Sequence, residues 1–453
     1  MKITSSLAAL SLTLLISAPL AAAVSPESAS KLGETLTPLG AERSGNADGT
    51  IPPWEGGITE PPANYNDGEH MVSPFPEDKV IATISIDNLE QYKDKLTPGQ
   101  LAMFEKYPDS YRMQVYQSRR TSALPEGAYD KIRQNAVNAS LDDGGNGVSG
   151  FQEVIPFPIP QNGLEAIWNH LIRYRGRSLN RDIVQAVVKG SGDYTLIHFA
   201  DEAIYPVNMK GHDPEEDSNI LVYFKQTTTA PARLTGNRIL VHDTINQVTE
   251  PRRAWIYNAG QRRVRRAPQV AYDGPGTSSD GLRTVDNFDL FSGAPDKYNW
   301  ELKGKREIYI PYNNYTLASD TLNYDDIIQP GHMNPDVLRY ELHRVWEVEA
   351  TLKEGERNVY GRRTFYIDED SWQIAAADYY DNRGDLWRVA EGFHVQYYYA
   401  DTPYYTAEAV YDLLASRYLV LGLFNESDGP IEFGFTANKM DYTPAALRRS
   451  GFR

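Results

Sequence analysis

The most constraining feature of this 453-residue chain is a run of alternating apolar and polar residues at positions 338–352. The even positions are apolar and the odd positions are polar or charged, and only Arg344 and Val345 depart from this rule. Because successive side chains of a β-strand point to opposite faces, a period of two over this length predicts one long strand. We expect its apolar face to lie against a core and its charged face to lie in water.

Shorter runs with strand character follow, and turns separate them. They cover residues 359–367, 372–376 and 387–397, with turns at residues 368–371 and 381–384. Asp, Asn and Ser bond to nearby backbone in turns, and Gly adopts positive φ. The pattern predicts an antiparallel meander of four strands with one apolar face. Two interpretations are open: an ordinary half-buried sheet, or a sheet curved around a cavity that its Trp and Tyr side chains line.

Helices and further strands are predicted on either side of the meander. Residues 97–100 read Thr-Pro-Gly-Gln, which supplies an N-cap, a proline at the first helical position and a capping box for a helix that ends near Tyr107. Asn162 is expected to cap a second helix, whose apolar face consists of Leu164, Ile167, Trp168, Leu171 and Ile172. Further strands are predicted at residues 220–228, 238–244, 253–257, 261–266 and 300–312, and within residues 407–424.

Residues 1–23 have the three parts of a secretory signal peptide. Lys2 supplies the positive charge, residues 7–16 are a short apolar region, and small residues end the segment at positions 21–23. The apolar region is too short to span a bilayer, and no later segment approaches the required length. The chain has no Cys, so we expect neither a disulfide nor the acylated Cys of a lipoprotein. These features predict export to the periplasm and cleavage after residue 23.

The charge of the chain excludes one class of partner and shows one local exception. With 61 acidic and 45 basic residues, the formal net charge is −16, and nucleic-acid binding needs a basic surface instead. One predicted hairpin nevertheless carries six arginines: Arg252, Arg253, Arg262, Arg263, Arg265 and Arg266. Guanidinium groups pair with carboxylate and phosphate groups through two hydrogen bonds. The cluster is therefore either a set of internal salt bridges or a patch for docking or for an anionic headgroup.

No pattern of catalytic or cofactor-binding residues stands out. The chain lacks a Cys nucleophile, its eight His residues show no metal-ligand spacing, and it has neither a Gly-x-Ser-x-Gly motif nor a Gly-rich phosphate loop. We therefore expect no cofactor, no metal and no enzymatic activity. A glycoside hydrolase is the remaining enzymatic alternative because carboxylates are abundant, but the sequence does not place two of them at the required separation.

Several motifs resemble a proteobacterial family of exported proteins that is named as a domain of unknown function. They are Thr-Pro-Leu-Gly-Ala-Glu at residues 37–42, Gly-Asn-Ala-Asp-Gly-Thr-Ile-Pro-Pro-Trp at 45–54, Val-Tyr-Gln-Ser-Arg-Arg-Thr at 115–121, Arg-Tyr-Arg-Gly at 173–176 and Phe-Tyr-Ile-Asp-Glu-Asp-Ser-Trp at 365–372. The family is similar to LolA and LolB, periplasmic lipoprotein carriers with an unclosed β-barrel and helices across its mouth. The resemblance implies this fold and compartment. It also implies an outer-membrane β-barrel protein and an inner-membrane exporter of the resistance-nodulation-division type as partners.

Together, these observations predict a β-rich α+β protein with an incomplete, curved antiparallel β-barrel and helices across its concave face. We expect an irregular and helical region at residues 24–150 and the LolA-like half-barrel at residues 151–453. The predicted function is that of a periplasmic carrier for a lipid or another hydrophobic ligand, and the alternative is a non-catalytic scaffold or adaptor for an outer-membrane protein. The residues expected to line the groove are Trp168, Leu171, Trp346, Phe365, Trp372 and Trp387.

Overall fold

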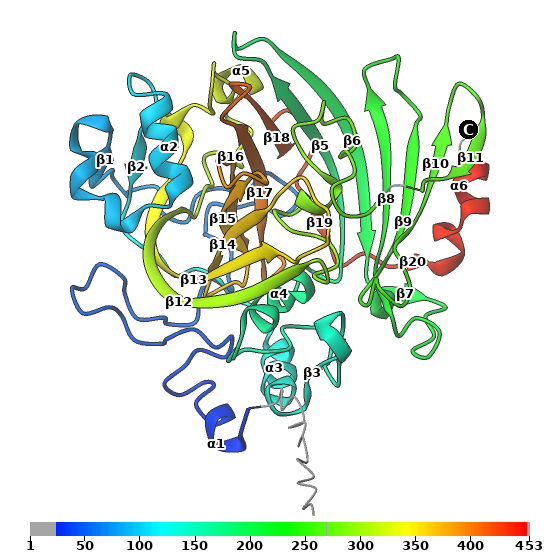
Figure 1. The fold of residues 1–453 in the computed structure, drawn as a ribbon, viewed down its shortest axis with the longest axis horizontal. Helices are drawn as coiled ribbons and strands as arrows, with labels where there is room; N and C mark the ends of the chain where they lie inside the picture. Colours follow the sequence, from blue (N-terminus) through cyan, green and yellow to red (C-terminus); the bar gives the residue numbers. More distant parts are fainter. Residues whose placement is uncertain (1–23, 269, 451–453) are drawn as a thin grey trace, which may run out of the picture.

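One large β-sheet dominates the structure (Figure 1). The computed structural model describes residues 24–268 and 270–450. Sixteen strands of this described chain form the sheet; its main path is β1-β2-β13-β14-β15-β16-β17-β18-β5-β6-β8-β9-β10-β11, with β12 paired to β13 and β19 paired to β5. The strands are β1 (Ala82–Ile84), β2 (Met113–Val115), β5 (Ser178–Val188), β6 (Tyr194–Ile204), β8 (Ile220–Ala230), β9 (Arg238–Thr244), β10 (Arg253–Asn258), β11 (Arg263–Arg266), β12 (Tyr298–Pro311), β13 (Tyr340–Leu352), β14 (Arg362–Asp368), β15 (Ile374–Tyr380), β16 (Leu386–Tyr397), β17 (Thr402–Asp412), β18 (Arg417–Leu423) and β19 (Glu432–Phe433).

The predicted meander is confirmed as strands β13 to β16. Each of these strands pairs antiparallel with the next, and β17 and β18 continue the series. The predicted strand at residues 300–312 is also confirmed: it is β12, which pairs along the length of β13. The strand starts shift by two or three residues, since β13 begins at Tyr340 and β14 at Arg362.

Both faces of the first half of β13 are buried, which corrects the expectation that one face lies in water. Glu341 and His343, on the predicted charged face, are 0% and 1% exposed. The backbone nitrogen of Arg119 donates to Glu341 (2.7 Å), and the hydroxyl of Ser118 donates to the carbonyl oxygen of Leu342 (2.7 Å). A segment of the N-terminal region therefore covers this part of the strand. Alternation identifies the two faces of a strand, but it does not reveal a layer that another part of the chain supplies.

Helices cover both faces of the sheet. α4 (Gly163–Ile172) packs against β12 and β13, while α2 (Pro98–Lys106) packs against β15 and β16. Both begin as predicted: the side chain of Asn162 accepts a hydrogen bond from the backbone nitrogen of Glu165, and Thr97 forms a capping box with Gln100. The remaining α-helices of the described chain are α1 (Pro26–Ala29), α3 (Glu126–Asn138), α5 (Tyr324–Ile327) and α6 (Pro444–Ser450).

The sheet is curved but does not close. β12 lies close to β15 and β16 although, in the described ranges, its strand partner is β13, so this part of the sheet is rolled. At the other end, β11 pairs with β10 and has no second partner among the described strands. The prediction of an incomplete, curved antiparallel barrel is confirmed. Figure 1 shows β8 to β11 at one side of the molecule, with α6 beside them.

The predicted N-terminal region shares its core with the half-barrel. Leu124 and Ile132 pack in the same cluster as Ile167 of α4 and Phe365 of β14, and β1 and β2 join the main sheet. The predicted boundary at residue 150, between the N-terminal region and the half-barrel domain, therefore stays a prediction. The predicted signal peptide, residues 1–23, lies outside the described residues. Within residues 24–268 and 270–450, no helix combines the length and apolar character needed to cross a membrane.

Candidate ligand-binding pocket

A pocket with about 170 Å³ of free space lies beside strands β5, β6, β8 and β9. Alternate residues of a strand share a face, and this spacing recurs in the wall, for example at Leu179 and Arg181 of β5 and at Ile239 and Val241 of β9. The apolar part of the wall consists of Leu179, Phe199, Leu221, Phe224, Ile239 and Val241. The end of α4 adds Trp168 and Leu171 to the same wall. The pocket thus lies where the sheet meets a helix end, and most of its wall is aliphatic or aromatic.

Residues 270–293, which we call the cover segment, form the other side of the pocket. The segment contributes Val270, Gly276, Thr277, Arg283, Val285, Phe288, Asp289, Ser292 and Gly293 to the wall. Five of its non-glycine residues have φ between 49° and 59°: Tyr272, Ser278, Asp280, Asp289 and Leu290. Such left-handed conformations are unfavourable for residues with a Cβ atom, so tertiary contacts must hold the segment in place.

Arginines that follow α4 hold the cover segment through Asp289. Arg173 donates to Oδ1 of Asp289 (2.5 Å), and Arg175 donates to Oδ2 (2.6 Å). Burial alone would raise the pKa of Asp289, but the two guanidinium groups outweigh it and lower this pKa to about 2. The fully buried ring of His170 adds contacts to the same loop, with Nε2 2.9 Å from the carbonyl oxygen of Asp289. Burial, followed by the Arg173 charge, holds the pKa of His170 well below its usual value, so the ring is neutral.

Further ion pairs lie at the pocket wall. Arg181 of β5 donates to Asp201 of β6 (3.4 Å), and Arg252 forms two hydrogen bonds of 2.8 Å with Asp243 of β9. Arg252 also donates to the carbonyl oxygen of Ser292 (3.0 Å), which ties the cover segment to the sheet. The pocket therefore has a mainly apolar wall and a few charged groups that ion pairs hold in place. Sites that bind amphipathic small molecules have the same composition.

The structure brings together two of the six residues predicted to line a groove. Trp168 and Leu171 lie at the pocket wall, and their contact with a ligand stays a prediction. The other four do not border this pocket, and their contact with a ligand also stays a prediction: Trp346, Phe365, Trp372 and Trp387. Phe365 and Trp372 are fully buried in the core around α4, and the other two are half-buried against that core. The Phe365 ring packs against Phe291 and Trp300, and the Trp372 ring stacks beside Trp346.

Sequence reasoning missed β5, β6 and most charged residues of the pocket. A Gly-Ser-Gly-Asp turn at residues 190–193 separates the two strands and could have predicted a hairpin. Arg175 belongs to the motif at residues 173–176 that carries the family resemblance, but the motif did not reveal its partner Asp289. Arg283 gave no local signal, because the strands that complete the pocket around it lie far away along the chain.

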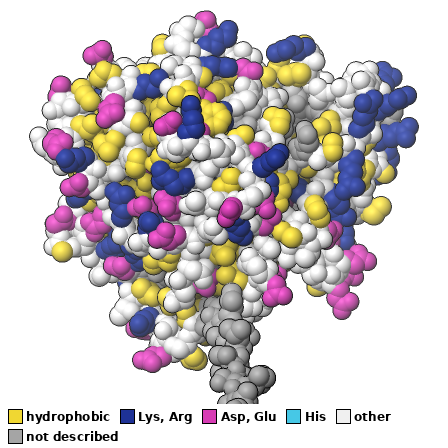
Figure 2. All heavy atoms as spheres, in the orientation of Figure 1, with side chains coloured by type: hydrophobic (Ala, Val, Ile, Leu, Met, Phe, Trp, Pro, Cys, Tyr) yellow, Lys and Arg dark blue, Asp and Glu magenta, His cyan; other side chains and the backbone are white. Residues whose placement is uncertain are grey.

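The six arginines of the predicted hairpin have different environments. Arg252 pairs with Asp243, and Arg253 pairs with Glu250. The other four are exposed and form no ion pair with any described residue: Arg262, Arg263, Arg265 and Arg266. They lie on β11 and the turn before it, and the exposed Arg448 and Arg449 belong to the adjacent helix α6. We call these six residues the basic edge; Figure 2 shows the concentration of basic side chains at this side of the molecule.

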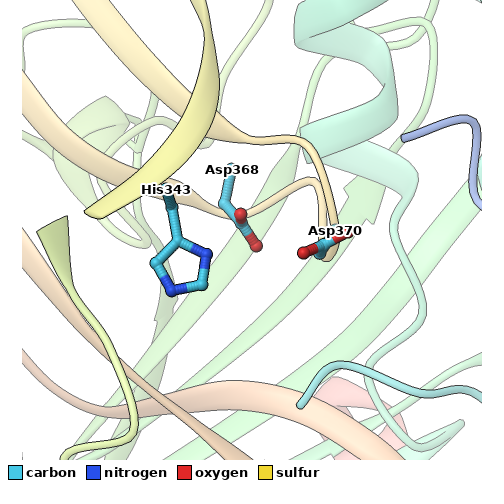
Figure 3. A group of neighbouring side chains, drawn as sticks. All are labelled: His343, Asp368 and Asp370. Carbon is cyan, nitrogen blue, oxygen red and sulfur yellow. The ribbon is translucent and has the colours of Figure 1, made fainter. Parts of the chain in front are cut away.

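A separate polar group consists of His343, Asp368 and Asp370 (Figure 3). One ligand atom of each lies within 4.8 Å of the others, a spacing that a metal ion could bridge. However, His343 contacts Glu341 (3.0 Å), and Arg120 donates two hydrogen bonds to Asp370 (2.6 and 2.8 Å). The group is therefore part of a buried ion network that ties the segment around Arg120 to the turn between β14 and β15.

A family model described as a protein of unknown function, DUF1329, matches residues 83–448. The chain belongs to this family. The predicted resemblance to a family named as a domain of unknown function is confirmed. One relative is the uncharacterized protein PA3922 of Pseudomonas aeruginosa. It is 54% identical to this chain over 439 residues, which cover 97% of this chain and 96% of the relative.

Solved structures are similar to part of this DUF1329 chain. A DUF1329 family protein from Desulfovibrio piger has a TM-score of 0.42 and 15% identity, covering 60% of this chain and 92% of that one. A putative outer membrane lipoprotein-sorting protein domain from Vibrio parahaemolyticus has a TM-score of 0.43 and 15% identity, covering 63% and 98%. A LolA superfamily protein from Nitrosomonas europaea has a TM-score of 0.35 and 12% identity, covering 57% and 90%.

Proposed function

We propose that this protein is a non-catalytic carrier that binds a lipid or another hydrophobic ligand in the pocket between the β5–β9 part of the sheet and the cover segment. The observation that supports this proposal is the partly exposed apolar wall of the pocket, where Leu221, Phe224, Ile239 and Val241 are only half-buried. A ligand that covers them gains about 0.8 kcal/mol for each methylene group removed from water. The free space of about 170 Å³ is similar to that of a cavity of about 150 Å³ that holds benzene, so it suits a small ring or part of an alkyl chain.

The proposed setting is the periplasm, to which the predicted signal peptide at residues 1–23 would direct the chain. There, a carrier would move its ligand between an inner-membrane exporter of the resistance-nodulation-division type and a β-barrel protein of the outer membrane. Release requires a partner that favours a more open conformation or binds the ligand better. The cover segment is the part proposed to move, since its strained backbone depends on a few contacts.

Native mass spectrometry of the protein purified from its own periplasm tests the carrier function. We expect a mass that exceeds the protein mass by one bound apolar molecule, which organic extraction and lipid analysis then identify. A ligand-free mass that does not change after incubation with membrane lipid extract would contradict the proposal. That result would favour the alternative of a scaffold that binds proteins only.

The basic edge supports a way for such a carrier to reach a membrane. We propose that it docks on an anionic lipid surface, where each basic residue contributes about 1 kcal/mol. The chain as a whole is acidic, so this local concentration of charge sets the orientation of the approaching molecule. Arginines also prevent an edge strand such as β11 from pairing with another chain, and this is the alternative role for the cluster.

Replacing Arg263, Arg265 and Arg266 with Gln is expected to weaken binding to phosphatidylglycerol-containing vesicles about a hundredfold, because three such contributions are lost. Vesicle co-sedimentation at low salt measures this affinity, and high salt should abolish wild-type binding. The control replaces three exposed arginines elsewhere with Gln, and it has the same net charge: Arg133, Arg357 and Arg383. If both triple variants lose the same affinity, the edge is not the docking surface.

A further inference from the structure

One arginine at the pocket lacks the carboxylate partner that the others have. Among the described residues, four arginines line the pocket, and three of them form ion pairs with Asp residues: Arg175, Arg181 and Arg252. The fourth is Arg283, which is only 7% exposed. Its side chain forms neither an ion pair nor a hydrogen bond within residues 24–268 and 270–450, and its Nε atom is enclosed without an acceptor.

An unpaired guanidinium group in this position is energetically unfavourable. Burial removes its water, and a buried charge normally requires a partner of opposite charge. The desolvation lowers the pKa of Arg283, and the charges of Glu408 and Asp201 only partly oppose this from a distance. Burial, followed by the charge of Asp289, raises the pKa of Glu408 to about 7, so this group is only partly ionised at neutral pH. Positive charge at this end of the pocket is therefore not fully balanced by the protein.

Backbone contacts of Arg283 help to shape the cover segment. The turn around it is closed through its backbone: its carbonyl oxygen accepts from the backbone nitrogen of Gly276 (2.9 Å) and from the hydroxyl of Ser279 (3.1 Å). The guanidinium carbon lies 5.5 Å from the centre of the Phe288 ring, which in turn lies 6.1 Å from the ring of Phe224 on β8. The unpaired charge is thus next to the apolar wall.

We propose that Arg283 binds an anionic headgroup, so that the pocket selects amphiphiles with a carboxylate or phosphate group over neutral molecules with the same alkyl chain. The guanidinium group presents N–H donors in a planar fork that matches two oxygen atoms of either anion. The ring of Phe288 and the β8–β9 wall then receive the alkyl chain. This inference rests on the proposed carrier function and specifies its ligand class.

Isothermal titration calorimetry with ligand-free, full-length mature protein tests this inference. The probes are decanoate, monodecyl phosphate and 1-decanol, which share one alkyl chain, at mildly alkaline pH. We expect the wild type to bind at least one anion about tenfold or more tightly than 1-decanol, since a hydrogen bond to a charged group is stronger than a neutral one. The tighter anion distinguishes a fatty-acid headgroup from a phospholipid headgroup.

The Arg283→Met variant is expected to lose this preference and to keep the wild-type affinity for 1-decanol. Arg283→Lys, which retains the charge but not the planar fork, should keep part of the preference. A preference that persists in Arg283→Met would overturn the inference. If the wild type binds all three probes equally, only the headgroup assignment fails; if it binds none of them, the carrier function fails as well.

Thermal unfolding separates headgroup binding from a structural role of the side chain. Arg283→Met should raise the midpoint of the ligand-free protein or leave it unchanged, because it removes an unpaired buried charge. The matched variant Arg175→Met should lower the midpoint, since it breaks the ion pair with Asp289. An equal decrease in both variants would show that Arg283 stabilises the fold, and this would overturn the proposal.

Discussion

Replacing Asp289 with Asn is expected to lower the free energy of unfolding by about 3–5 kcal/mol. The change removes the carboxylate that Arg173 and Arg175 share and leaves two buried guanidinium groups without it. Asn has nearly the same shape and tolerates the left-handed φ of 59° at this position. The expected loss of stability therefore comes from removing the charge and not from a change in the backbone. Urea-induced unfolding followed by Trp fluorescence measures the difference.

The matched control is Asp280→Asn in the same cover segment. Asp280 also has a left-handed φ, of 49°, but its side chain is 67% exposed and pairs with Arg417 at the surface. Exposed ion pairs contribute about 0–1 kcal/mol, so this variant should be nearly as stable as the wild type. Equal losses for the two variants would contradict the role assigned to Asp289.

Ala203→Phe is expected to weaken the binding of 1-decanol at least about tenfold. Ala203 of β6 borders the pocket, and its register neighbours are Leu179 of β5 and Phe224 of β8. A benzyl group there occupies part of the free space of about 170 Å³ and excludes the alkyl chain. Losing the burial of only two methylene groups, about 1.6 kcal/mol, is enough for a tenfold effect. Titration calorimetry measures this affinity.

The control for this substitution is Ala200→Phe on the same strand. Ala200 is also half-buried, but its position in β6 places it on the other face of the sheet, away from the pocket wall. We expect wild-type affinity for 1-decanol in this variant. If Ala203→Phe also binds as tightly as the wild type, the ligand does not occupy the pocket beside β6.

Features that depend on neighbouring residues were predicted well. The caps at Thr97 and Asn162 and the meander from β13 to β16 follow from local rules of hydrogen bonding and from the period of side-chain direction. The strands β8, β9 and β10 also lie within a residue or two of their predicted positions. The family resemblance is confirmed because it rests on contiguous motifs that align without knowledge of the fold.

The candidate site depends on packing that the local sequence pattern does not show. Trp168 and Leu171 of α4 border the pocket, whereas Phe365 and Trp372, which were assigned from the apolar face of the meander, do not. Trp168 is nevertheless only 2% exposed and packs in the same core cluster as those two residues. A large aromatic residue has the same local pattern in both environments. What differs is the layer packed against it, and residues distant in the sequence supply much of that layer: Trp372, for example, donates to the carbonyl oxygen of Leu39.

Local sequence was therefore sufficient for the meander, for strands β8 to β10, for the capped helices α2 and α4, and for the family and the acidic character of the chain, since each depends on residues close together or on a sum over the chain. Long-range packing alone places the cover segment over β5–β9 and pairs Asp289 with Arg173 and Arg175. It also leaves Arg283 without an ion pair or side-chain hydrogen bond among the described residues. The physical reason is that a charge's environment depends on distance in space, and the chain brings residues 173, 283 and 408 together only when the sheet has formed and curved.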